Sequence, residues 1–153
     1  MLLSRVFPEL WKFGSLERAT RGAPIVLVAD VVNGAAESRY SALREPGGAA
    51  GYQVTAGKTL WLTRVVMSAD VANTEWLLGS GTADAGSSQV AAPAGMASES
   101  SRADGVANVR RVPAAYTPVE YDILFDVVAG RYPCVRALSQ NTTLQIEYRG
   151  IEV

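Results

Sequence analysis

The chain has 153 residues, of which 48% are hydrophobic and 19% are charged, so it is too apolar for a disordered tail and too weakly charged to bind by charge alone. A chain of this length buries roughly 68–70% of its unfolded surface around a single core, which predicts one domain. The net charge of -1, from 14 basic and 15 acidic residues, excludes the basic surface that general nucleic-acid binding requires.

The first 22 residues form an N-terminal arm that differs from the rest of the chain. Because proline suits the first turn of a helix and disfavours helix before it, we predict a short helix from Pro8 to Phe13, ended by Gly14. The arm has more apolar area than a segment in water should carry, so it either folds back onto the domain or docks on another protein. The side chains expected to make this contact are Leu3, Val6, Phe7, Leu10, Trp11 and Phe13.

From Pro24 onward the pattern is that of β-strands. Ile25 to Val32 is rich in β-branched residues and ends at the turn pair Asn33-Gly34. Strands separated by turns, with no long helix among them, predict an all-β fold in residues 23–153, an antiparallel β-sandwich of jelly-roll type. The further predicted strands are residues 37–43, 52–55, 59–68, 74–78, 106–112, 119–128, 131–138 and 142–149.

Residues 79–105 interrupt this pattern with a long run of Gly, Ala, Ser and Asp. The run has almost no large apolar side chain, so it cannot bury enough area to offset the entropy of ordering. Such long loops in compact domains often make contacts or serve a function. We therefore expect either a working surface or a tolerated floppy insertion here.

The residues that most enzymes use are missing or badly placed. The chain has no histidine, which removes the usual general base near neutral pH and the commonest metal ligand. The single cysteine, Cys134, cannot form an internal disulfide, and we predict that it is a small buried hydrophobe. The sequence therefore predicts a non-enzymatic protein with no cofactor and no catalytic or metal-binding residues.

A row of carboxylates, Glu120, Asp122 and Asp126, lies on one face of the strand predicted at 119–128. We expect this row to face solvent or a partner, while a catalytic pair and calcium binding remain as alternatives. Other aspartates beside loops that could bind calcium are Asp70, Asp84 and Asp104, whose spacing matches no EF-hand. The opposite, core-facing set of the same strand is Tyr121, Ile123, Phe125 and Val127.

Residues 52–63, which read YQVTAGKTLWLT, resemble a hairpin of small phage structural proteins, in which a run Y-x-V-x-A-G-K-T-L-x-L-T opens one sheet of a sandwich. The Gly/Ala/Ser loop and the regular last strand add to the resemblance. It implies a virion protein on the outer surface of a bacteriophage, most plausibly a capsid decoration (cement) protein, and otherwise part of a fibre or neck. The implied partners are further copies in a homotrimer and the major capsid protein or other virion proteins.

Two features of the sequence bear on where such a protein works. The N-terminus lacks the apolar core and cleavage site of a signal peptide, and no apolar run approaches the ~18 residues of a membrane span. We therefore expect synthesis in the host cytoplasm and no membrane partner. The alternative function is a receptor- or carbohydrate-binding module, in which Trp61, Trp76 and Tyr40 or Tyr116 would stack on sugar rings.

Overall fold

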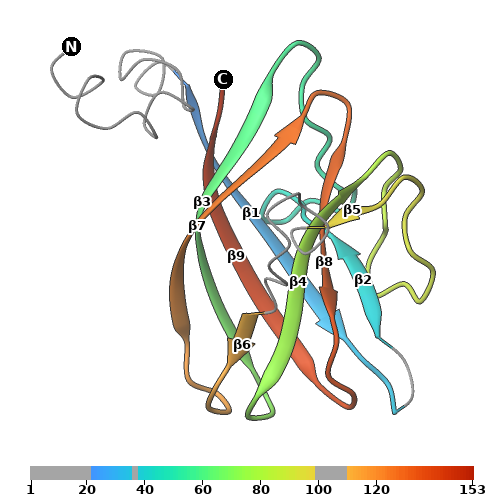
Figure 1. Ribbon diagram of the computed structural model, residues 1–153, viewed down its shortest axis with the longest axis vertical. Coiled ribbons are helices and arrows are strands. Elements are labelled where there is room, and N and C mark those ends of the chain that lie inside the picture. The colour runs from blue at the N-terminus through green and yellow to red at the C-terminus, as the bar shows by residue number, and fades with distance from the viewer. Residues whose placement is uncertain (1–21, 36–37, 99–109) are drawn as a thin grey trace, which may run out of the picture.

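The computed structural model describes residues 22–35, 38–98 and 110–153, and these residues contain nine β-strands and no helix (Figure 1). The predicted helix Pro8–Phe13, with the other residues of the arm up to position 21, lies outside the described residues. The strands are β1 (Ala23–Val32), β2 (Arg39–Ala42), β3 (Thr59–Ala69), β4 (Thr74–Gly81), β5 (Ala97–Ser98), β6 (Arg110–Val112), β7 (Val119–Val128), β8 (Tyr132–Ala137) and β9 (Thr143–Glu152).

The strands form two antiparallel sheets that lie as two layers (Figure 1). The first sheet has the order β1-β9-β3-β7. The second sheet has the order β2-β8-β4, and the short strands β5 and β6 pair with β4 along its remaining edge. Most connections cross from one sheet to the other, so strands far apart in sequence become neighbours. The expected all-β fold with antiparallel sheets is confirmed.

One hydrophobic core lies between the two sheets. The first sheet supplies Leu27, Leu62 and Tyr148, and the second supplies Trp76 and Leu78, all fully buried. The rings of Trp76 and Tyr148 meet edge to face with their centroids 6.1 Å apart. Alternation along each strand explains this arrangement, because every second side chain points inward. The core is therefore β-sandwich-like and uses both sheets.

A bulge bends the middle of the first sheet. The register of β3 shifts between Leu62 and Arg64 against both of its neighbours, β7 and β9. Opposite the bulge, a side chain at Gly150 would overlap the carbonyl oxygen of Trp61. Glycine is therefore required where the β3 backbone approaches β9 closely.

Three predictions about the backbone are wrong. Residues 52–55 form no strand, because the amide of Tyr52 donates to Leu43 while Val54 bonds to a different segment, residues 130–131. Asn33 and Gly34 do not take the positive φ expected of this turn pair: the side chain of Asn33 is buried and donates to the carbonyls of Ala137 and Ser139.

The third wrong prediction is the start of the long loop, which the composition places at residue 79. Strand β4 continues to Gly81, because its last residues pair with both β8 and β5. Of the strand predicted at 106–112, the structure describes only residues 110–112, which form β6. The described residues contain no helix long and apolar enough to cross a membrane.

Candidate functional site

The outer face of the second sheet is covered by loop 82–96. A second, smaller apolar cluster joins Tyr40, Ala42 and Cys134 of the sheet to Ala85 and Met96 of the loop. These strand residues pair so that they share the face opposite the main core. Leu77, on the same face of β4, is also buried. The chain therefore closes this face itself.

Backbone hydrogen bonds attach the same loop to the edge of β2. The amide of Tyr40 donates to the carbonyl of Gln89 and the amide of Gln89 donates back to Tyr40, both at 2.7 Å. The amide of Ala42 donates to the carbonyl of Gly86 at 2.8 Å. The loop thus occupies the outer edge of β2, which would otherwise be free to pair with another strand.

Two charged side chains hold the ends of the loop. Asp84 accepts the amide of Gly51 through one oxygen and the amide of Gly86 through the other, each at 2.8 Å. Arg131 donates to the carbonyls of Ser80 and Gly95 at 2.8 and 2.5 Å. Residues 82–96 are therefore fixed to the sandwich, whereas residues 99–105 of the predicted loop lie outside the described chain.

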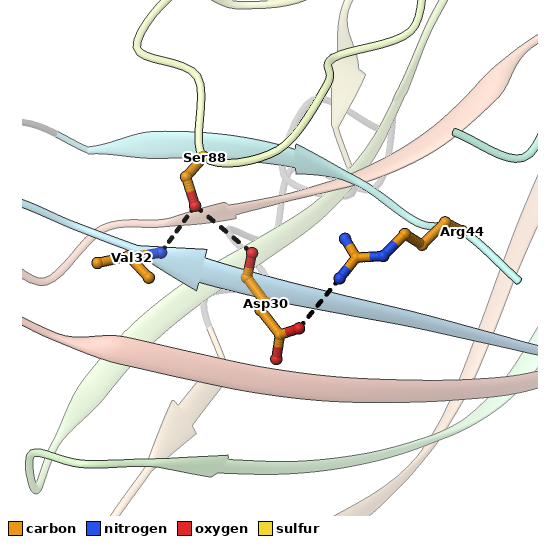
Figure 2. Close-up of polar contacts among 4 residues, drawn as sticks. All are labelled: Asp30, Val32, Arg44 and Ser88. Carbon is orange, nitrogen blue, oxygen red and sulfur yellow. Dashed lines mark hydrogen bonds and ion pairs between the residues drawn. The ribbon is translucent and has the colours of Figure 1, made fainter. Parts of the chain in front are cut away.

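Loop 82–96 also reaches the edge of β1 in the first sheet, as Figure 2 shows. The amide of Val32 donates to the Ser88 hydroxyl at 2.9 Å, and this hydroxyl lies 3.5 Å from the carbonyl oxygen of Asp30. Arg44 forms an ion pair of 3.0 Å with the Asp30 carboxylate, and its backbone pairs with Val28. The edge of β1 is therefore covered from Val28 to Val32.

The outer face of the first sheet is different, because its apolar side chains are exposed. The described residues contain seven exposed large apolar side chains. Four of them, Val26, Val32, Leu124 and Val128, point outward from β1 and β7, and Val71 and Tyr116 lie close to the end of β3. Only Val90 belongs to the opposite side, in loop 82–96. We call the outward side chains of β1, β9, β3 and β7 the open face.

A shallow hollow of about 260 Å³ crosses the open face over β1, β9 and β3. Its apolar lining includes Val28, Val66 and Pro118. A second hollow of about 170 Å³ adjoins it, because both are lined by Ser68 and Gln145. The two hollows make a depression large enough for several side chains of a partner.

The charged groups of the open face are mainly acidic. Its strands carry five carboxylates and two arginines, and Arg44 adds a third cation, which gives a formal net charge of about -2. Arg64 pairs with Glu120, and Arg149 pairs with Glu147 at 2.8 Å. Such exposed pairs contribute only about 0–1 kcal/mol each to folding. The five carboxylates are Asp30, Glu120, Asp122, Asp126 and Glu147.

The acidic row of β7 lies where the sequence places it. Glu120 and Asp122 are exposed, Asp126 is half-buried, and Ile123, Phe125 and Val127 point into the core. Of the other aspartates, Asp70 accepts the amide of Thr143 at 2.7 Å, Asp84 holds loop 82–96, and Asp104 lies outside the described residues. Among the described residues no group of three or more His, Cys, Asp or Glu could hold a metal ion.

The aromatic residues predicted to stack on sugars do not form one site. Trp76 is fully buried in the core and Tyr40 is buried under loop 82–96, so the prediction that they contact a ligand is wrong. Trp61 and Tyr116 reach the surface, but Tyr116 bonds to Ala69, eight residues from Trp61 along β3. At ~3.3 Å per residue, ~26 Å separate the two positions.

A buried polar cluster that the sequence reasoning missed lies at the end of β9. The carboxylate of Glu152, only 4% exposed, accepts a hydrogen bond from the Tyr52 hydroxyl and lies 3.9 Å from the Lys58 ammonium. Burial, and then the Glu152 carboxylate, raise the pKa of Tyr52 to about 12. A phenol with this pKa stays protonated at neutral pH, so the cluster fastens residues 52–58 to β9. The alternation of Leu144, Ile146 and Tyr148, continued to residue 152, could have revealed it.

The arm residues predicted as an assembly interface all lie outside the described residues. Cys134 is buried as predicted, and burial raises its pKa to about 12, so it has little thiolate for nucleophilic attack.

Comparisons of the chain with protein-family models, curated proteins and solved structures find no match in any of the three. The function must therefore be argued from the geometry above, in which the open face is the principal feature.

Proposed function

We propose that this chain is a structural subunit of a bacteriophage particle, a decoration (cement) protein that binds the outer capsid surface and forms homotrimers. It acts by adhesion through buried area and catalyses no reaction. The observation that carries the proposal is the open face itself, which has exposed apolar side chains on its edge strands β1 and β7 and a hollow lined in part by Val28 and Val66 over β1, β9 and β3. Apolar side chains and a hollow on one uncovered face are typical of a protein contact site.

The size of the open face suits such a contact. Its strands β1, β3, β7 and β9 have 10 or 11 residues each. With ~3.3 Å per residue and ~4.8 Å between strands, the flat area is about 600 Å². A standard interface buries about 800 Å² per partner once side-chain relief is included, so this one face approaches the required area.

The strand order supports the same function. If β5 and β6 are counted as one interrupted strand beside β4, each sheet has four strands, in the orders β1-β9-β3-β7 and β2-β8-β4-β5/β6. This order supports an eight-stranded jelly roll, a fold used by viral capsid proteins and also by lectins. Because one fold serves several functions, the open face carries more of the argument than the topology.

The alternative function is a carbohydrate-binding module, but two of the aromatic residues predicted to bind the sugar are buried. Trp76 and Tyr40 are buried and Trp61 lies far from Tyr116, so these four side chains do not form one stacking platform. We therefore favour protein contacts over glycan binding.

The test is the oligomeric state of the full-length chain by size-exclusion chromatography with light scattering. We expect a mass three times the 16.2 kDa of one chain. Leu124→Arg, on the open face, should shift this mass to that of a monomer. Val90→Arg is the matched control, because Val90 is also exposed but lies in loop 82–96.

Circular dichroism should show that both variants keep the same fold. A wild-type chain that stays monomeric at all concentrations would contradict the proposal. So would a trimer that Leu124→Arg and Val90→Arg disturb equally.

A further inference from the structure

We propose that the N-terminal arm of one copy, residues 1–21, binds the open face of a neighbouring copy and seats apolar side chains in the hollow beside Val66. The inference rests on the proposed function, since it needs an assembly of several copies. It names the segment that covers the open face. It also explains why an apolar arm and exposed apolar side chains on one sheet face occur in the same chain.

The place where the arm joins the sandwich favours this occupant. The described chain begins at Gly22, which lies against Ile151 and Val153 at one end of the open face. The hollow at Val28 lies five residues further along β1 than Ala23, or ~17 Å away. An extended arm of 21 residues spans up to ~70 Å, which is enough to reach the corresponding hollow of an adjacent copy.

The arm and the open face are chemically complementary. The arm offers large apolar side chains, among them Phe7, Leu10 and Trp11, to a hollow lined by Val28 and Val66. Full burial of such side chains contributes about 1.5–3 kcal/mol each.

The charges agree in sign as well. The arm has four basic and two acidic residues, a net charge of about +2, within a chain of net charge -1, and the open face carries about -2. Opposite charge on two surfaces speeds their encounter and selects against wrong partners. The arm is thus the basic part of an otherwise acidic chain. The basic residues of the arm are Arg5, Lys12, Arg18 and Arg21.

When arms are exchanged between copies, each arm binds one open face and each open face receives one arm. If the arm covered the open face of its own copy, that face would not be available for contacts between copies. If it covers the next copy, each subunit gives one arm and receives one, and a ring of three closes without free arms. Such head-to-tail contacts generate rings when the rotation closes.

The experiment is photo-crosslinking in the full-length protein. A photoreactive benzoylphenylalanine replaces Gln145, an exposed residue of β9 that lines both hollows. This copy also carries Trp11→Phe, which marks its own arm by mass. It is co-expressed with a wild-type copy, and the crosslinked peptides are identified by mass spectrometry. The matched control carries the photoreactive group at Ala91, exposed in loop 82–96.

We expect crosslinks from position 145 to arm peptides that contain Trp11, which can come only from the other copy, and at least fivefold fewer from position 91. Crosslinks exclusively to arm peptides that carry the Trp11→Phe mark would show that each arm covers its own copy and would overturn the inference. No crosslink from position 145 to residues 1–21 would also overturn it.

The oligomeric state distinguishes a failure of the arm-exchange inference from a failure of the proposed function. A trimer without crosslinks to the arm refutes only this inference and leaves another occupant, such as the capsid shell, for the open face. A monomer refutes the proposed function itself.

Discussion

The outer faces of the two sheets differ in whether other parts of the chain cover them. The second sheet lies under loop 82–96, which buries Tyr40, Cys134 and part of Met96. The first sheet keeps Leu124 and Val128 exposed on its outer face. Within residues 22–35, 38–98 and 110–153, a loop therefore covers the outer face of one sheet and leaves the outer face of the other exposed. The exposed apolar side chains of the open face therefore bear on function, because the other sheet of the same domain has its outer face covered.

The strand edges sharpen the contrast. Loop 82–96 pairs with the edge of β2, and Ser88 and Arg44 cover the edge of β1. Exposed edges are the usual route by which sheets join other chains through backbone hydrogen bonds. One edge of each sheet is therefore occupied by the chain itself. The contact that we propose for the first sheet uses the side chains of its open face.

The largest expected difference in stability is between truncation of a side chain under loop 82–96 and truncation of one on the open face. Tyr40→Ala removes a buried ring that also lies 5.2 Å from the guanidinium carbon of Arg136, and should lower the free energy of unfolding by about 2–4 kcal/mol. Val128→Ala, on the open face, should change it by less than about 0.5 kcal/mol at concentrations where the chain is monomeric. Urea denaturation measures both, and equal losses would remove the distinction between the faces.

A smaller effect should follow from altering the bulge of the first sheet. Gly150→Ala adds a methyl group that overlaps the carbonyl oxygen of Trp61, so β3 must move away from β9. We expect a loss of about 1–3 kcal/mol, typical of overpacking. The control is Gly34→Ala, where the added methyl meets no atom within 4 Å and φ is not positive. If both variants unfold at the same urea concentration, the close approach at Gly150 has no role in stability.

Much of the fold follows from local pattern. Val119–Val128 is a strand with the bounds that its alternation predicts, and its acidic and apolar sets occupy opposite faces. Alternation fails where hydrogen bonds go to several partners. The segment at Tyr52 bonds to Leu43 and to residues 130–131, and the buried Asn33 side chain bonds to Ala137. Arg131 is 77 residues away from Val54 and Ala137 is 104 residues away from Asn33, so no local signal marks these partners.

The candidate site could be predicted only in part. The sequence shows which side chains of a strand share a face, but whether a loop covers that face is decided by tertiary contacts. Trp76 illustrates the difficulty, because β4 is buried on both faces and its apolar run gives no sign of which residues reach the surface. Residues 82–96 have almost no large side chain and still cover a sheet, because they are held by backbone hydrogen bonds and by Asp84 and Arg131.

A still smaller effect is expected where loop 82–96 meets the first sheet. Ser88→Ala removes the acceptor of the Val32 amide and should lower the stability by about 1 kcal/mol. Hydrogen exchange should show faster exchange of the Val32 amide, with the core amides of β9 unchanged. Ser87→Ala, at an exposed neighbouring residue, should alter neither. Unchanged protection at Val32 in the Ser88 variant would mean that the loop does not cover this edge.

The smallest expected effect at neutral pH concerns the Cys134 thiol beneath loop 82–96, whose pKa burial raises to about 12. A disulfide reagent such as DTNB requires the thiolate, so Cys134 should remain unreacted for hours at pH 8. A cysteine introduced on the open face by Val128→Cys, in a Cys134→Ala background, should react within minutes. Comparable rates at the two positions would show that loop 82–96 does not close the second sheet.

The same thiol predicts how the closed face responds to alkali. Its folded pKa lies above the unfolded value of about 9, so the neutral thiol favours the folded state fully below pH 9, and this contribution is lost as the pH rises toward 12. The wild type should therefore lose up to roughly 1.4 kcal/mol per pH unit more than Cys134→Ala in this range. Urea denaturation of both proteins from pH 7 to pH 10.5 measures the difference. Parallel curves would mean that the thiol ionises without opening the covered face, which its burial beneath Met96 and the loop argues against.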